Sequence, residues 1–199
     1  MAEDPLEKAT RGKDVSIEWM PFELRPYPTP TLEPKGEYLQ RAWRESVLPL
    51  AERFGVFMKL PEVSPQPHTH LAFEGYQYAK QYGKGNEYNH SIFSAFFQKG
   101  ENIGDINVLT RLAKEIGLNQ DEFRQALRER KYRESHQLAL KHAYEEARIT
   151  AVPTFFIGTR RLQGLHPAES LKIIIEEELS KLNSDKIPEG FSCEINGNC

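Results

Sequence analysis

The chain has 199 residues, of which 39% are hydrophobic and 28% charged, and its net charge is −3. This length supports one well-buried core, or one domain with a large insertion. The acidic balance offers no basic face to phosphate backbones, so we expect no nucleic-acid partner. No apolar run reaches the roughly 20 residues that span a bilayer, and the polar start MAEDPLEKATRGKD is unlike a secretory signal. We therefore expect a cytoplasmic protein without a membrane partner.

The N-terminal part predicts a short helix, a strand and a loop. Residues 3–10 have a helical composition, and Gly12 follows as a stop signal. Residues 15–24 alternate apolar and polar side chains, and this period of two is typical of a strand. Residues 25–34 contain four prolines. Because proline donates no backbone hydrogen bond, this stretch predicts an extended loop.

A block of helices is predicted next. Apolar residues recur at helical spacing over 37–54, where Pro49 should kink or divide the helix. The Phe and Tyr stripes within 73–97 fit buried helix faces better than a cofactor site. The same period and several capping signals predict further helices over 69–82, 89–99, 105–116 (N-cap Asp105, stop Gly117), 120–130 (capping box Asn119 and Glu122) and 132–148.

The run ITAVPTFFIGTRRLQG, residues 149–164, predicts a β-hairpin. An apolar run over 154–157 is followed by a Gly-Thr turn and a return strand over 160–163. Pro153 fits the first position of a strand, because proline has no N–H to give to a ladder. A last helix should follow and bury these apolar residues: Leu171, Ile174, Ile175, Leu179 and Leu182.

This order of elements, with three motifs, resembles the thioredoxin superfamily and within it the DsbA-like proteins of the FrnE type. The motifs are AVPTFFIG at 151–158, AFFQKGENIGD at 95–105 and WMPFEL at 19–24. The resemblance implies an α/β fold, with an all-helical insertion between the βαβ and ββα halves of a thioredoxin-like domain. The implied organisation is a thioredoxin-like domain at 1–34 and 149–183, a helical insertion at 35–148 and a flexible tail with a cysteine pair at 184–199.

The resemblance also implies parts that the 199 residues lack. In the family, a strand and a Cys-Pro-x-Cys-type motif precede the helix that matches residues 3–10, and the helix N-terminus stabilises a thiolate. We therefore expect the first strand and this motif upstream of Met1 in the natural protein. Without that strand, the edges of 15–20 and 154–157 would be unpaired unless they pair directly or two chains exchange strands, which makes a homodimer one expected partner.

Three residues are substrate-binding candidates. The resemblance implies a cis bond before Pro153, which would leave the backbone of Val152 free to pair with an extended substrate by strand addition. A purely structural proline turn is the alternative. His68 stands at the start of the predicted helix 69–82, where relatives often have an Asn-Thr pair near the thiol site. The resemblance therefore adds His68 to Val152 and Pro153.

Both cysteines, Cys193 and Cys199, lie in the last seven residues. They resemble the second cysteine pair at the C-terminus of some FrnE-type proteins, which implies an auxiliary catalytic redox pair. A disulfide across so short a loop would stabilise by only about 2 kcal/mol, so a purely structural staple is disfavoured. The alternatives are two reduced thiols without a role and half of a zinc site. His68, His70 and His90 complete no recognised ligand spacing, and we expect neither a metal nor a resident cofactor.

The resemblance suggests three functions. The favoured one is a thiol–disulfide oxidoreductase that acts on protein or small-molecule thiols and disulfides. The second is a glutathione-dependent isomerase or transferase like the 2-hydroxychromene-2-carboxylate isomerases, which use a serine where the first cysteine would stand; glutathione would then be a co-substrate. The third is a non-catalytic module that binds peptides through the strand surface near Pro153.

Overall fold

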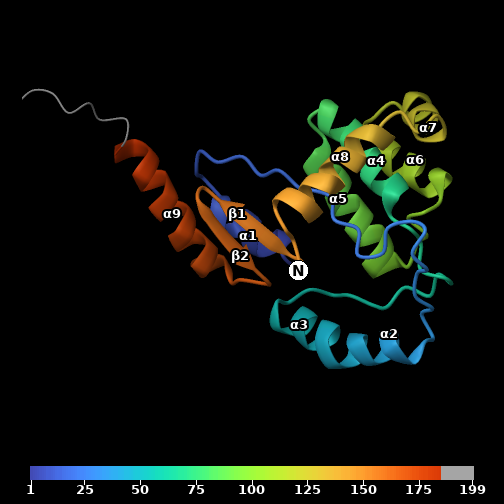
Figure 1. Ribbon diagram of the computed structural model, residues 1–199, viewed down its shortest axis with the longest axis horizontal. Helices are drawn as coiled ribbons and strands as arrows, with labels where there is room; N and C mark the ends of the chain where they lie inside the picture. Colours follow the sequence, from blue (N-terminus) through green and yellow to red (C-terminus); the bar gives the residue numbers. More distant parts are fainter. Residues whose placement is uncertain (185–199) are drawn as a thin grey trace, which may run out of the picture. The chain divides into compact units, whose positions relative to one another are not determined.

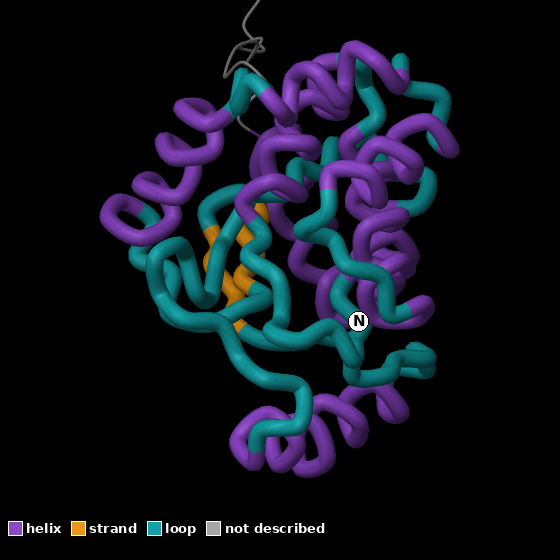
Figure 2. The backbone as a smooth tube through the Cα atoms, turned by 90° about the vertical axis from the view of Figure 1, so that its right-hand side faces the viewer, coloured by secondary structure: helices purple, strands orange, loops and turns teal. Residues whose placement is uncertain are grey.

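The computed structural model of the protein describes residues 1–184, and helices make up most of them, whereas the strands form one hairpin (Figure 1 and Figure 2). The chain forms two compact units. The larger unit consists of residues 16–152 with Met1, and the smaller consists, among the described residues, of 2–15 and 153–184. Each unit has its own buried apolar cluster. Within the described residues, no helix is both long and apolar enough to cross a membrane.

The smaller unit packs a β-hairpin and two helices together (Figure 1). Its elements are α1 (Glu3–Thr10), β1 (Thr154–Ile157), β2 (Arg160–Gln163) and α9 (Ala168–Ser184). The strands are antiparallel, with Thr154 opposite Gln163 and Ile157 opposite Arg160. The predicted hairpin is therefore confirmed with its predicted strand ends.

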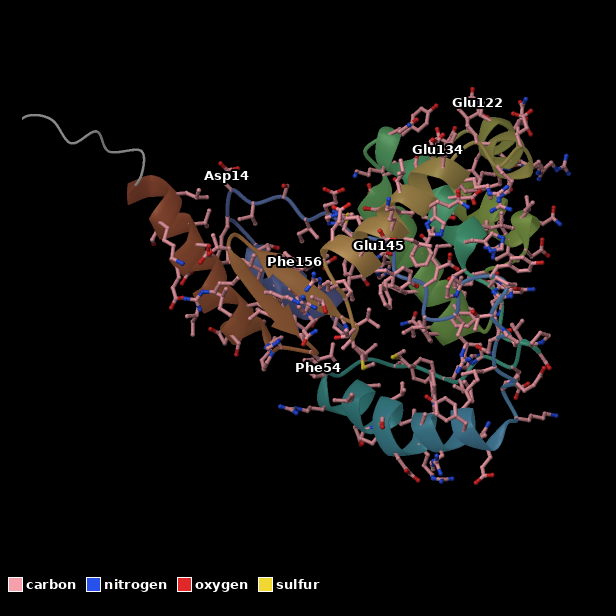
Figure 3. The ribbon with its side chains drawn as sticks, in the orientation of Figure 1. Asp14, Phe54, Glu122, Glu134, Glu145 and Phe156 are labelled. Atoms are coloured by element: carbon pink, nitrogen blue, oxygen red, sulfur yellow. The ribbon has the colours of Figure 1, made fainter. Side chains whose placement is uncertain are left out.

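Side chains of the hairpin alternate between the core and solvent, as a strand period of two requires. Phe155 and Ile157 pack on the cluster formed by Ala9, Leu171 and Ile175. Phe156, labelled on β1 in Figure 3, is exposed.

The core face predicted for the last helix is only partly correct. Leu171 and Ile175 are buried and Leu179 packs against them, but Leu182 is 58% exposed. Leu182 lies in the last turn of α9, and the apolar cluster of the smaller unit has no member that far along the helix.

A carboxylate of α9 holds the turn between β1 and β2. Glu178 Oε2 accepts hydrogen bonds from the Thr159 backbone N–H at 2.9 Å and from its hydroxyl at 3.2 Å. Gly158 has φ +55°, and a Cβ there would lie 2.1 Å from Glu178 Oε2. The turn therefore needs glycine for its backbone conformation and for its space. The Lys181 ammonium and the Thr159 N–H hold the pKa of Glu178 at about 2.

The larger unit contains the helices of the chain from Glu37 to Glu146. They are α2 (Glu37–Ala42), η1 (Trp43–Val47), α3 (Leu48–Arg53), α4 (His70–Gln81), α5 (Gly85–Ser94), η2 (Ala95–Lys99), α6 (Ile106–Glu115), α7 (Gln120–Arg128), α8 (Arg133–Lys141) and η3 (His142–Glu146), where η marks a π-helical turn. Each predicted helix is present. The helix predicted at 89–99 begins four residues earlier, at Gly85.

The predicted helix signals act as expected. The Asp105 carboxylate accepts the Asn107 N–H at 2.8 Å, and Asn119 Oδ1 accepts the Asp121 N–H at 3.0 Å. These bonds satisfy N–H groups that have no partner within the helix. The predicted break near Pro49 is the π-helical turn before it, where the Leu48 N–H bonds to the Trp43 carbonyl five residues back.

The core of the larger unit is built from α4, α5, α6 and α7. Gly75 of α4 permits the closest approach there, because a Cβ at this position would lie 2.2 Å from the Tyr88 hydroxyl and 2.8 Å from the Phe123 ring. Tyr78 packs edge-to-face on Phe123 with ring centroids 5.2 Å apart. Aromatic side chains of the 73–97 stretch thus fill a core, in agreement with their helical spacing.

The strand predicted over 15–24 is wrong. Residues 15–20 alternate in burial as the sequence pattern indicates, but they belong to no strand, because the sheet of the described chain contains β1 and β2 alone. A strand forms only when a neighbour satisfies its backbone groups, and no strand is hydrogen-bonded to this segment. Instead, Trp19 packs edge-to-face on Phe93 with centroids 6.3 Å apart, and Glu23 bonds to His136.

The boundaries of the two compact units therefore differ from the predicted domain boundaries. The divisions lie at 15/16 and 152/153, whereas the predicted insertion covered 35–148. Residues 16–34 join the helical unit because their contacts are with it. One such contact is the Gln66 N–H donating to the Leu32 carbonyl at 2.8 Å.

Candidate functional site

Two of the predicted substrate-binding residues, Val152 and Pro153, stand where the smaller unit begins. Val152 is 46% exposed. The Pro153 carbonyl accepts the Gly164 N–H at 2.8 Å, which extends the hairpin by one bond beyond β1. Pro153 thus starts the hairpin as predicted.

The predicted cis bond before Pro153 is wrong for this structure. The cis peptide bonds within residues 1–184 precede Pro28 and Pro65. A trans X-Pro bond is favoured by about 0.5–1 kcal/mol unless packing opposes it, and the exposure of Val152 shows that tight packing does not surround this bond.

His68 lies beside the proline-rich loop, just before α4. Its Nδ1 is 3.3 Å from the Arg25 carbonyl, and its ring packs edge-to-face on Tyr27 with centroids 5.6 Å apart. The His68 and His70 rings are 6.2 Å apart. Across residues 1–184, no group of three or more His, Cys, Asp or Glu side chains is arranged to hold a metal ion. Cys193 and Cys199 lie outside the described residues.

A buried polar network surrounds the first turn of α4. Glu23 Oε1 is 2.7 Å from His136 Nε2 of α8, and Glu23 Oε2 accepts the Thr69 hydroxyl at 3.2 Å. The Tyr144 hydroxyl of η3 donates to the Glu23 backbone carbonyl. One glutamate therefore joins three parts of the chain that are far apart in the sequence: its own segment, the start of α4, and the α8–η3 stretch.

The surroundings of Glu23 keep it ionised. Burial alone would raise the pKa of Glu23, but the hydrogen bond and charge of His136 and the Thr69 hydroxyl outweigh it, so the pKa is lowered. An ionised carboxylate only accepts hydrogen bonds, so His136 Nε2 must carry the proton of the 2.7 Å bond. The other ring nitrogen, His136 Nδ1, is buried without a hydrogen-bond partner in the described chain.

A buried carboxylate of α4 also forms an ion pair. Glu74 of α4 is fully buried, and Arg130 binds it through Nε at 2.8 Å and Nη2 at 2.6 Å. Arg130 has φ +54°, a left-handed conformation that non-glycine residues rarely adopt. Burial and the Arg130 guanidinium both lower the pKa of nearby His70.

The chemistry open to the Glu23–His136 pair is limited by its burial. A carboxylate bonded to an imidazole can serve as a general base, but Glu23 is 3% exposed and His136 2%, so no substrate reaches either group. We therefore interpret the network as structural: it holds residues 19–24 against the start of α4. Sequence reasoning missed it, because no local pattern connects Glu23 with His136, 113 positions away.

The fold and these sites define a thioredoxin-like protein of the DsbA class, with a small two-stranded sheet and a largely helical body. The family model described as DSBA-like thioredoxin domain matches residues 1–176. The uncharacterized protein YwbO of Bacillus subtilis (strain 168) is 51% identical over 177 residues, which is 88% of each chain. The chain therefore belongs to the DSBA-like thioredoxin family.

Solved structures share this fold at low sequence identity. A probable DsbA oxidoreductase from Streptomyces coelicolor has a TM-score of 0.70 and 16% identity, with 96% of this chain and 86% of that chain covered. A 2-hydroxychromene-2-carboxylate isomerase has a TM-score of 0.57 and 17% identity, with 76% and 72% covered. At these identities, the likeness establishes the fold alone.

Proposed function

We propose that the protein is a thiol–disulfide oxidoreductase that exchanges disulfides with protein or small-molecule substrates. The observation that carries this proposal is the match of residues 1–176 to the DSBA-like thioredoxin domain. The 51% identity to YwbO agrees with the same family. The 199 residues contain two thiols, Cys193 and Cys199, and we assign the exchange within this chain to them.

The exchange transfers two electrons. One protein thiolate attacks a sulfur of the substrate disulfide, a mixed disulfide forms, and the other substrate sulfur leaves as a thiolate that takes up a proton. The second protein thiolate then attacks the protein sulfur of the mixed disulfide and releases the second substrate thiolate. The substrate is thereby reduced to a dithiol, and Cys193 and Cys199 are oxidised to a disulfide.

The test is trapping of the mixed disulfide. Reduced protein is mixed with a peptide that contains one disulfide, and intact masses are measured after acid quenching. We expect Cys193→Ser or Cys199→Ser to accumulate a peptide adduct, because the resolving thiol is missing. The wild type should reduce the peptide without an adduct.

The matched control is the double variant Cys193→Ser/Cys199→Ser, which should form no adduct. Peptide reduction by this variant at the wild-type rate would contradict the assignment. Absence of reduction and of adducts in every variant would contradict the oxidoreductase function itself.

A glutathione-dependent isomerase is the second candidate, favoured by the fold likeness to 2-hydroxychromene-2-carboxylate isomerase. Such an enzyme uses glutathione without net oxidation. We therefore expect it to bind reduced glutathione, measured by calorimetry, and to leave the peptide disulfide intact. A non-catalytic peptide-binding module would instead bind the peptide and exchange no thiols.

A further inference from the structure

The smaller unit has a surface cavity of about 310 Å³ between α1 and α9. It is lined by Lys8, Ala9, Arg11, Lys13, Ala168, Glu169 and Lys172. Four of these seven residues are cationic and one is acidic. This composition differs from the whole chain, which carries a net charge of −3.

Local structure explains why the cations meet there. Gly12 has φ +75°, and the Lys13 N–H donates to the Thr10 carbonyl at 3.0 Å, so the chain turns back at the end of α1. This turn places Arg11 and Lys13 beside the first turn of α9. The small side chains of Ala9 and Ala168 leave the space open between them.

Two of the four cations are free to bind a ligand. Lys8 pairs with Asp4 at 2.8 Å, and Lys13 pairs with Glu176 at 2.6 Å. Arg11 and Lys172 form neither a hydrogen bond nor an ion pair within residues 1–184. The positive charge of Lys172 lowers the pKa of Glu176 without a hydrogen bond between the two side chains.

Helix dipoles account for some of these charges but not for Lys172. Lys8 and Arg11 stand at the C-terminal end of α1, where the helix dipole favours cations. Lys172 lies one turn into α9, near an N-terminus that carries partial positive charge. The dipole of α9 therefore does not explain a cation at that place.

We propose that this cavity binds a small molecule through a phosphate group. The Arg11 guanidinium can bind two phosphate oxygens in parallel, and Lys172 supplies a point charge. A phosphate monoester carries about −1.5 to −2 charge at pH 7 and neutralises both cations, whereas a monocarboxylate neutralises one. The cavity volume of about 310 Å³ suits a phosphate on a small carrier.

The experiment titrates the full chain with inorganic phosphate and pyrophosphate, with sodium chloride and malonate at matched ionic strength as references. Backbone amide NMR shifts of Gly12, Ala168 and Glu169 are followed. We expect saturable shifts with Kd of about 1 mM or lower, tighter for pyrophosphate. Equal shifts with sodium chloride, or equal affinity for malonate, would overturn the proposal.

Charge variants sharpen the test. Arg11→Gln and Lys172→Gln should each weaken phosphate binding about threefold to fivefold, and Glu169→Gln should tighten it by a similar factor because it removes the competing carboxylate of the lining. Lys84→Gln is the matched control, since Lys84 is a lysine of the larger unit that pairs with Glu87 at 3.0 Å. Unchanged affinity in both Arg11→Gln and Lys172→Gln, or equal loss in Lys84→Gln, would overturn the assignment.

Discussion

The two units of this protein use buried charge in opposite ways. The larger unit encloses carboxylates in its interior: Glu74 pairs with Arg130, and Glu23 is hydrogen-bonded to His136. The smaller unit has an apolar centre of Ala9, Leu171 and Ile175, and its key carboxylate, Glu178, binds a surface turn. Within residues 1–184, Glu74 has one cationic partner, Arg130, whereas Glu178, although only 6% exposed, has the Lys181 ammonium, the Arg160 guanidinium and the Thr159 N–H, so loss of one partner costs more in the first case. The difference predicts large costs for the loss of single partners in the larger unit and a pH-dependent cost in the smaller one.

The largest effect is expected for Arg130→Ala. This change leaves the fully buried Glu74 without its partner, and we expect a loss of about 3 kcal/mol in the free energy of unfolding, at the lower end of the range for broken buried pairs because Arg130 is partly exposed. Urea denaturation followed by circular dichroism measures it. Arg128→Ala, an exposed arginine of α7, is the matched control and should change stability by about 0.5 kcal/mol or less. Equal stability of the two variants would refute the role of the pair.

Gly75→Ala should have the next largest effect. The added Cβ would overlap the Tyr88 hydroxyl and the Phe123 ring, so we expect a cost of about 2 kcal/mol in thermal or urea unfolding. Tyr88→Phe should be close to neutral alone, because the buried hydroxyl has no hydrogen-bond partner in the described chain. When Tyr88→Phe is combined with Gly75→Ala, we expect the double variant to be more stable to unfolding than Gly75→Ala alone. No recovery would show that the hydroxyl is not the obstacle.

A smaller loss is expected for Tyr144→Phe. It removes the hydroxyl that donates to the Glu23 carbonyl and keeps the ring that packs on Phe22 with centroids 4.9 Å apart. We expect a cost of about 1 kcal/mol, measured by urea denaturation. Tyr38→Phe, at an exposed tyrosine of the same unit, is the control. If Tyr38→Phe lowered the free energy of unfolding as much as Tyr144→Phe, the hydrogen bond from Tyr144 to Glu23 would not be what stabilises the protein.

The effect expected for Glu178→Gln depends on pH and is greatest above pH 4.5. The folded pKa of Glu178 is about 2, below its ordinary value of 4.5, so its stabilising contribution is complete above pH 4.5 and is lost as the pH falls toward 2. The variant should lack this pH-dependent component of the melting temperature. The Thr159 amide shift reports the same titration by NMR. A wild-type Thr159 shift that titrates near pH 4.5 would contradict the bond to Glu178.

The site was only partly predictable from the sequence. Pro153 and the hairpin follow from local signals, because proline, glycine and alternating apolar residues restrict the backbone directly. The network of Glu23, Thr69, His136 and Tyr144 spans 121 positions between Glu23 and Tyr144. No local pattern connects these residues, so the network was not predicted.

The sequence by itself determined the helices, their caps and the hairpin. Their hydrogen bonds close within a few residues, so the caps at Asp105 and Asn119 act wherever the rest of the chain lies. Only the tertiary structure decided that residues 15–24 form no strand, that the bond before Pro153 is trans, and that Arg130 pairs with Glu74. A strand needs a neighbour, an X-Pro isomer depends on the packing around it, and a buried charge needs a partner that folding brings from 56 residues away.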